Sequence, residues 1–579
     1  MTLLRQRLAG AGAVVLAAAV SIPATSADAG RGISPGKSVQ VPVQLLSFND
    51  YHGHLEANDP PLASKWDPTV TPVGGVEYLS ATVKALRAKV GDANSLTVAA
   101  GDLIGGSPFL SGMFHDEPSV ESLETLGLDV SSVGNHEFDE GTTELLRMQN
   151  GGCHPIDGCY FPEAPYDGAS FSWLAANVVK KSNGKPLLPA VAVRAVKGVQ
   201  VGFIGMTLQE TPSLVNPSGV STVDFGDEIE TANAQAAVLK KRGVNAIVVL
   251  LHEGGANRGG YNACTQISGA ILAIAQGITH DVDAIITGHT HEPYVCRIPD
   301  VAGVPRLVTS AASYGQVVTE TTLVVDKATG EVDRSASMAQ NHLVARTIGK
   351  DPMETAVLEK WRALAVPMGA RVVGTQVEDI LGDSNGNRGI ETPMADLVAD
   401  AWLYGTTGPA KGGAQIAFQN VGGTRATFRF NAIQGGEKPG EITYAEAYAV
   451  VPFSNLMVTL DLTGDQIRRA LEKQSVASGR SRLDLALGVS AGFTYSWDVS
   501  KDPGSRIVPG SMALNGVPMS MTATYRVALP NFLADGGDQF TPFTEGTNRL
   551  GGGEDLAMLV SYLQDHPGLH APASRVDGL

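Results

Sequence analysis

Seven side chains with the chemistry of metal ligands occur in five separate stretches of the chain: Asp50, His52, Asp102, Asn135, His252, His289 and His291. Two divalent cations held roughly 3.5–4 Å apart require one bridging carboxylate and several further oxygen or imidazole ligands. An Asp-x-His at 50–52 and a His-x-His at 289–291 each bring two ligands together. If the backbone is extended there, each pair projects from one face and can bind one ion. A lone Asp or His is ordinarily structural, so it is the whole set that predicts a two-metal site.

Each of these stretches begins with an apolar, β-branched run and ends in a cluster of Asp, Asn, His and Gly. The stretches are 41–55, 95–106, 128–141, 245–255 and 284–293. Such continuous apolar runs are typical of strands buried on both faces. Helical patterns over 75–90 and 228–243 lie between them, which favours a strand–helix–strand layout. In layered α/β folds, functional groups gather at the carboxyl ends of strands.

The ordered motifs D-x-H (50–52), G-D (101–102), G-N-H-E (134–137), His252 and G-H-x-H (288–291) resemble those of the calcineurin-like metallophosphoesterases. The resemblance implies a four-layer α/β/β/α domain. It further implies that Asp50, His52 and His291 hold one ion, that Asn135, His252 and His289 hold the other, and that Asp102 bridges them. The mixed donor set accepts Zn²⁺, Mn²⁺, Co²⁺ or Fe²⁺.

The segment NHEFDEG also contains His136 and Asp139, which are not among the predicted ligands. In the same family such a pair resembles a catalytic dyad in which the carboxylate orients the imidazole. A protonated imidazole there can stabilise charge on the transferring phosphoryl group and the leaving oxygen. The alternative is that Asp139 caps a helix.

The second half of the chain carries a different set of motifs. Segments 388–402, 419–425, 450–456 and 525–540 resemble the carboxy-terminal domain of the 5′-nucleotidase family. One departure is Pro393 and Ala395, where that family usually has Asn and Gly. The resemblance implies a smaller α/β substrate-binding domain.

The same resemblance assigns roles in nucleotide binding. Arg388 and Arg425 would contact phosphate, Asn420 the base region, Asp538 the ribose hydroxyls, and Phe453 and Phe532 would clamp the base; Gly422 and Gly423 lie in the same QNVGGTR motif. Arginine suits phosphate oxygens, and aromatic rings stack on any base. The alternative for the two phenylalanines is a place in the core.

Four segments follow from these patterns: a signal peptide (1–29), a catalytic domain (41–345), a linker helix (346–370) and a substrate-binding domain (371–579). The signal consists of Arg5 and Arg7, an apolar run over 8–20 and the small residues 27–29. Cleavage near Ala29 predicts a secreted protein without a membrane span; an uncleaved anchor helix is the alternative. The net charge of −17 disfavours charge-driven binding to nucleic acids or anionic membranes.

Export predicts that the four cysteines form disulfides. The short spacing favours a Cys153–Cys159 bridge, which would leave Cys264 to pair with Cys296. Two other connectivities, and a zinc knuckle around 153–159, remain alternatives.

Together these features predict a secreted dimetal phosphohydrolase that releases phosphate from nucleoside 5′-monophosphates, with other 5′-nucleotides and UDP-sugars as further candidate substrates. A 2′,3′-cyclic phosphodiesterase with 3′-nucleotidase activity is the enzymatic alternative. An inactive nucleotide-binding surface protein is the alternative from another class, but such proteins are expected to lose metal ligands. The predicted partner is a small-molecule nucleotide, and the oligomeric state is left open.

Overall fold

A computed structural model describes residues 39–57, 67, 69–70, 72–215, 219–382, 387–433, 435–453, 455–475 and 484–579. The predicted signal peptide lies outside these residues. Within them, no helix combines the length and the apolar character that crossing a bilayer requires.

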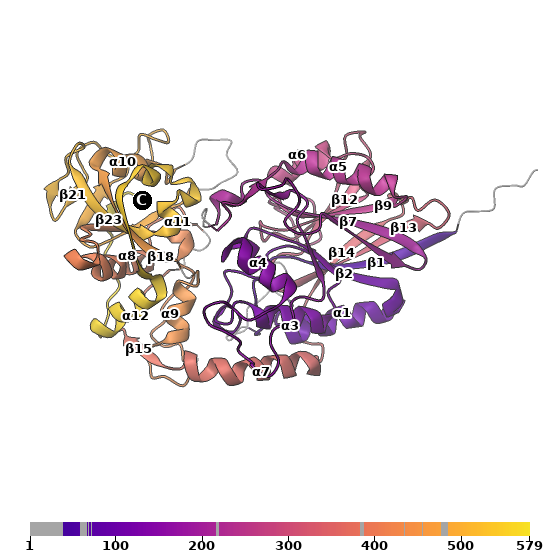
Figure 1. Ribbon diagram of the computed structural model, residues 1–579, viewed down its shortest axis with the longest axis horizontal. Coiled ribbons are helices and arrows are strands. Elements are labelled where there is room, and N and C mark those ends of the chain that lie inside the picture. Colours follow the sequence, from indigo (N-terminus) through magenta and orange to yellow (C-terminus); the bar gives the residue numbers. More distant parts are fainter. Residues whose placement is uncertain are drawn as a thin grey trace, which may run out of the picture. The chain divides into compact units, whose positions relative to one another are not determined.

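Two six-stranded sheets form the first half of the chain (Figure 1). The first has the order β14 (Met338–Leu343), β13 (Val317–Asp326), β1 (Gln40–Phe48), β2 (Ser95–Ala100), β3 (Val130–Ser132) and β4 (Ser172–Leu174). The second has the order β11 (Tyr294–Pro299), β12 (Pro305–Ser310), β10 (Ala284–Thr287), β9 (Ala246–His252), β7 (Val199–Thr207) and β6 (Val191–Val196). Strands β1 to β4 are mutually parallel, as are β7, β9, β10 and β12.

Alternating side chains of these strands enter different cores, because successive residues of a strand point to opposite faces. Leu45 shares a core with Val248 and Leu250 of the other sheet, whereas Leu46 faces the core that includes α1 (Val76–Val90) and α3 (Glu117–Leu126). Ile247 and its alternating neighbours pack against α5 (Glu228–Lys241) and α6 (Ala270–Gly277). The order is therefore helix, sheet, sheet, helix, which confirms the predicted four-layer fold.

The second half is built on a five-stranded sheet. Its order is β19 (Leu487–Val489), β16 (Ile416–Asn420), β23 (Thr524–Pro530), β18 (Leu456–Thr463) and β24 (Thr547–Glu554). One face packs on α8 (Pro393–Thr406), α9 (Tyr444–Val450) and α12 (Asp555–Asp565), and the other on α10 (Gly464–Glu472). Pro393 occupies the first position of α8, where a missing N–H costs no hydrogen bond, and Ala395 is fully buried. The two substituted residues are thus compatible with a regular start of this helix.

The helix α7 (Pro352–Gly369) connects the halves. Its N-cap is Asp351, whose carboxylate accepts from the Met353 N–H at 3.1 Å. Trp361 is buried and donates from Nε1 to Glu121 at 2.7 Å. Pro367 lies inside the last turn rather than ending the helix. The domain bounds themselves stay a prediction.

Shorter helices and strands connect or flank these elements in both halves. These are α2 (Phe109–Gly112), α4 (Gly141–Asn150), α11 (Asn531–Ala534), β5 (Val178–Lys180), β8 (Val223–Phe225), β15 (Val372–Thr375), β17 (Glu441–Thr443), β20 (Phe493–Ser496), β21 (Ala513–Leu514), β22 (Val517–Pro518) and β25 (Val576–Asp577). Disulfides join Cys153 to Cys159 and Cys264 to Cys296, which confirms the favoured pairing.

Candidate metal centre and active site

The predicted ligands lie where five strands of the two sheets end, but the backbone of the two paired motifs is not extended. Asp50, His52, Asp102, His289 and His291 all have positive φ, between 48° and 71°. The expectation that extended backbone would aim each Asp-x-His or His-x-His pair is therefore wrong. The loops turn sharply because Asp50 N–H donates to Gly101 O and His52 N–H donates to Asp102 O, both at 3.0 Å. Left-handed backbone costs these residues about 1–2 kcal/mol each and concentrates at functional sites.

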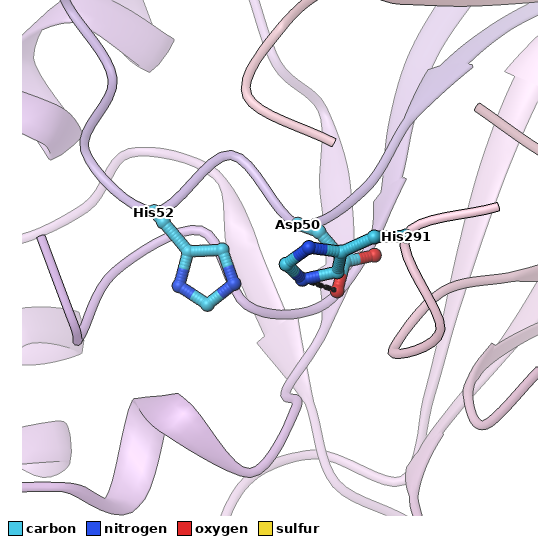
Figure 2. Close-up of side chains that lie close together, drawn as sticks. All are labelled: Asp50, His52 and His291. Atoms are coloured by element: carbon cyan, nitrogen blue, oxygen red, sulfur yellow. Dashed lines mark ion pairs between the residues drawn. The ribbon is translucent and has the colours of Figure 1, made fainter. Parts of the chain in front are cut away.

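One group of ligand atoms consists of Asp50, His52 and His291, which converge from loops after β1 and β10 (Figure 2). His291 Nε2 lies 3.2 Å from Asp50 Oδ1, the ion pair drawn in Figure 2. Asp50 is fully buried and also accepts from the His289 N–H at 3.0 Å, which ties the loops of the two sheets together.

A second group consists of Asp102, His252 and His289, with Asn135 beside it. His252 Nε2 lies 2.9 Å from Asp102 Oδ2, and Asn135 Oδ1 lies 3.1 Å from His289 Nδ1. The same Asp102 oxygen is 3.6 Å from His52 Nε2 of the first group. Asp102 thus stands between the two groups, as a bridging ligand must.

The chemistry of these side chains fits divalent ions. His52 Nδ1 is 2.8 Å from Gly105 O and His252 Nδ1 is 2.7 Å from Ala100 O, so each imidazole donates from Nδ1 and directs Nε2 towards the ligand group. His52 Nε2 is buried and makes no hydrogen bond within the described part of the chain. Burial would raise the pKa of Asp102, but the neighbouring histidines hold it well below its ordinary value. Imidazoles around an ionised carboxylate are a suitable donor set for a transition metal, which would displace any proton on their Nε2 atoms.

Glu137 supports this centre, although it was not among the residues predicted to have a role. Its side chain is 3% exposed. It accepts from the backbone N–H groups of Asp102 at 2.9 Å, of Leu103 at 2.8 Å and of Gly134. One carboxylate therefore joins the loop after β2 to the loop after β3. Its place in the G-N-H-E motif is the sequence feature that could have indicated this role.

His136 and Asp139 form the predicted pair, with His136 Nδ1 2.8 Å from Asp139 Oδ2. Asp139 makes no capping bond to α4, whose N-cap position is Glu140. Gly105 is pressed against both residues at a φ of 83°, and a Cβ there would clash with the His136 carbonyl. Burial disfavours the imidazolium, but Asp139 and Asp102 outweigh it and raise the pKa of His136.

A cavity of about 680 Å³ is lined by residues from both halves of the chain. From the first half it includes Asn135, His136, Asp139 and His289. From the second half it includes all eight predicted substrate residues: Arg388, Asn420, Gly422, Gly423, Arg425, Phe453, Phe532 and Asp538. The structure thus brings the two predicted sets to one space.

One ring contact in this cavity crosses between the halves, and two further contacts join residues of the second half. The Phe453 ring stacks near His136 at a centroid distance of 6.2 Å, and the Arg425 guanidinium lies 5.1 Å from the Phe453 centroid. Asn420 Nδ2 donates to Asp538 at 3.0 Å. Both Phe453 and Phe532 are partly exposed, and Phe532 also packs against the core of the second half.

Tyr314 was likewise not predicted. It has a φ of 58° and its ring lies 5.9 Å from that of His52 and 5.2 Å from that of His291. Its ring packs against one side of the ligand group formed by Asp50, His52 and His291. No spacing pattern marks it, because it follows β12 and approaches the ligands only in three dimensions.

Two family models match the chain. The calcineurin-like phosphoesterase model matches residues 44–293, and the model of the 5′-nucleotidase C-terminal domain matches residues 372–545. Together they include every residue of the predicted site.

The chain is also similar to known proteins. It is 35% identical over 543 residues to Endonuclease YhcR of Bacillus subtilis (strain 168), an alignment covering 93% of this chain and 41% of that protein. It is 30% identical over 578 residues to the cell wall protein Lmo0130 of Listeria monocytogenes, covering 95% of this chain and 70% of that one. The chain thus spans less than half the length of the first of these relatives.

Among solved structures, the 5′-nucleotidase precursor from Thermus thermophilus is similar in fold throughout. The TM-score is 0.70 at 28% identity, covering 93% of this chain and 99% of that one.

Proposed function

The chain belongs to the 5′-nucleotidase family, with a calcineurin-like phosphoesterase domain followed by a 5′-nucleotidase C-terminal domain, and from this premise we propose that it hydrolyses nucleoside 5′-monophosphates. The products are a nucleoside and inorganic phosphate. The Thermus relative is named a 5′-nucleotidase, which supports the assignment.

One observation carries the proposal. The cavity that contains His136 and His289 also contains Arg425, Phe453 and Asp538. A nucleoside monophosphate needs a charged site for phosphate, an acceptor for ribose hydroxyls and an apolar surface for the base. All three are present in a volume of about 680 Å³, which suits a molecule of that size.

Two divalent ions are the proposed cofactors. Asp50, His52 and His291 would hold one, Asn135, His252 and His289 the other, and Asp102 both. When bound there, such ions supply positive charge that stabilises a transferring phosphoryl group. Backbone carbonyls fix the Nδ1–H of His52 and of His252, which leaves Nε2 of both rings as the ligand atom.

The remaining steps belong to side chains of this chain. Asp139 orients His136, whose Nδ1 it engages at 2.8 Å, so that the imidazole can donate a hydrogen bond to the substrate. Arg388 and Arg425 orient the phosphate with their planar guanidinium groups. Phe453, stacked near His136, excludes water from the side of the imidazole that it covers.

A substrate panel tests the proposal. Phosphate release would be measured with 5′-AMP, 3′-AMP, cyclic 2′,3′-AMP and UDP-glucose, with Mn²⁺ or Zn²⁺ added and with chelator as control. We expect metal-dependent turnover with the highest kcat/KM for 5′-AMP. Preference for cyclic 2′,3′-AMP and 3′-AMP would favour the phosphodiesterase alternative, and no turnover on any compound would favour a binding protein.

Secretion is proposed on separate grounds. Two disulfides within the described residues suit an oxidising compartment, and one relative is named a cell wall protein. Mass spectrometry of the protein in the culture medium should find its N-terminus near Gly30; a cell-associated chain that retains residues 1–29 would contradict this.

A further inference from the structure

A second group of potential ligands lies outside the predicted dimetal centre. His115, in the turn after α2, and His154 and Asp157, in the loop closed by the Cys153–Cys159 disulfide, bring their ligand atoms within 4.8 Å of one another. His115 Nε2 is 2.8 Å from Asp157 Oδ2, and His154 Nδ1 is 3.5 Å from the same oxygen. The two imidazole rings stack with centroids 3.7 Å apart.

These side chains are held in place by the fold. The disulfide and the reciprocal backbone bonds between His154 and Gly158, at 3.1 and 3.0 Å, close the loop that carries two of them. His115 and Asp116 both have positive φ, 48° and 60°. Asp116 is buried and accepts from the Gly105 N–H at 2.8 Å, so this strained turn is anchored to the active-site loop.

The neighbouring carboxylates divide into two roles. Glu140 Oε2 lies 2.8 Å from His115 Nδ1, on the side of the ring opposite Asp157. This is the arrangement in which a carboxylate fixes the tautomer of a metal-binding histidine. Glu144 is instead engaged by Arg147, with contacts of 2.7 to 3.0 Å. It is therefore unsuited to bind a cation.

We propose that His115 Nε2, His154 Nδ1 and Asp157 bind a divalent transition-metal ion, with Zn²⁺ as the best match, and that Glu140 orients His115. Two imidazoles and one carboxylate leave a fourth position open for water or a substrate oxygen. All four residues line the cavity that contains His136, so the ion would add positive charge at its rim.

Binding exchanges interactions that exist without metal. His154 Nδ1 accepts from the Asp157 N–H at 3.2 Å, and this bond must give way. Glu140 and Asp157 both face His115, and both carboxylates stabilise its protonated form. A bound cation would displace the His115 proton and replace its positive charge beside the two carboxylates. Ion pairs between protonated His115 and its two carboxylates would explain the position of His115. They would leave the His154 ring that stacks on it without a role.

The test counts metal ions. Protein stripped with chelator would be dialysed against Zn²⁺, and bound zinc measured by elemental analysis in wild type, in the double variant His154→Gln with Asp157→Asn, and in His570→Gln. His570 is a matched control because it also faces a glutamate, Glu378, but is 75% exposed. We expect three equivalents in wild type and the control, and two in the double variant.

Cobalt supplies an independent readout. With Co²⁺ in place of Zn²⁺, the visible d–d spectrum of wild type minus that of the double variant should show one imidazole-ligated ion. Asp157 is 52% exposed and both substitutions lie in a surface loop, so the variant should keep the circular dichroism of the folded protein. Equal zinc content in wild type and the double variant, whatever the total, would overturn the site. Neither result depends on hydrolysis of nucleotides.

Discussion

The substitution Glu137→Gln isolates what holds the centre together. Glutamine has nearly the same size but offers one carbonyl oxygen where the carboxylate offers two. In the protein, one oxygen of Glu137 accepts from Asp102 and Gly134, and the other accepts from Leu103. If the glutamine carbonyl oxygen faces Asp102 and Gly134, those two bonds remain. The amide NH₂ group then faces the Leu103 N–H, and neither of these two donors has an acceptor there.

The expected cost follows from that geometry. A buried donor without an acceptor costs about 1–3 kcal/mol, and bonds to a charged group that become neutral lose part of their strength, so we expect about 2–4 kcal/mol in total. The loops carrying Asp102 and Asn135 should shift as a result. Since misplacement by about 1 Å can cost about 100-fold in rate, kcat should fall about 10- to 100-fold.

Urea denaturation and initial rates of 5′-AMP hydrolysis at saturating metal would measure both effects. Glu359→Gln makes the same chemical change at an exposed site on α7 and should alter neither. A Glu137→Gln protein with the wild-type denaturation midpoint and full activity would refute the view that this carboxylate organises the loops.

Three further predictions concern the cavity. His136→Ala should lower kcat about 100- to 10,000-fold, as expected for loss of an acid–base group, and elemental analysis should find metal content unchanged; loss of metal would make His136 a ligand. Replacing both Phe453 and Phe532 with Ala should raise KM for 5′-AMP while sparing p-nitrophenyl phosphate, and equal losses on both would mean that the rings serve the core. Burial alone would lower the pKa of His115, but the carboxylates of Glu140 and Asp157 raise it to about 9. In the presence of chelator, the stabilisation of the folded protein by protonated His115 is therefore complete below about pH 6.5 and disappears as the pH rises through 9. A difference in unfolding temperature between wild type and His115→Gln that does not shrink from pH 6 to pH 10 would contradict this.

The sequence predicted the layered fold and the spatial grouping of these side chains because both depend on local order. Each ligand motif directly follows an apolar run, and such runs become parallel strands whose carboxyl ends meet. Asp50, His252 and His289 could therefore be assigned to one site although more than 200 residues separate the first from the others.

Other features of the site lie beyond sequence patterns. The left-handed φ of Asp50 and His52 arises from backbone bonds to Gly101 and Asp102, which sit in another loop. Glu137 acquires its role only where the loops after β2 and β3 come within reach of one carboxylate. His115 and His154 are 39 residues apart, on elements with no shared period, and the disulfide loop carries one of them to the other.

The hydrogen bonds among these loops connect the ends of strands from both sheets. Asp50 N–H donates to Gly101 O, Glu137 holds the loop of Asp102 to that of Gly134, and His252 Nδ1 faces Ala100 O. The His289 N–H donates to the Asp50 carboxylate. Each bond joins the ends of two different strands, so no single loop can relax its strained backbone without breaking a bond to another. The fold itself therefore positions the predicted ligand atoms.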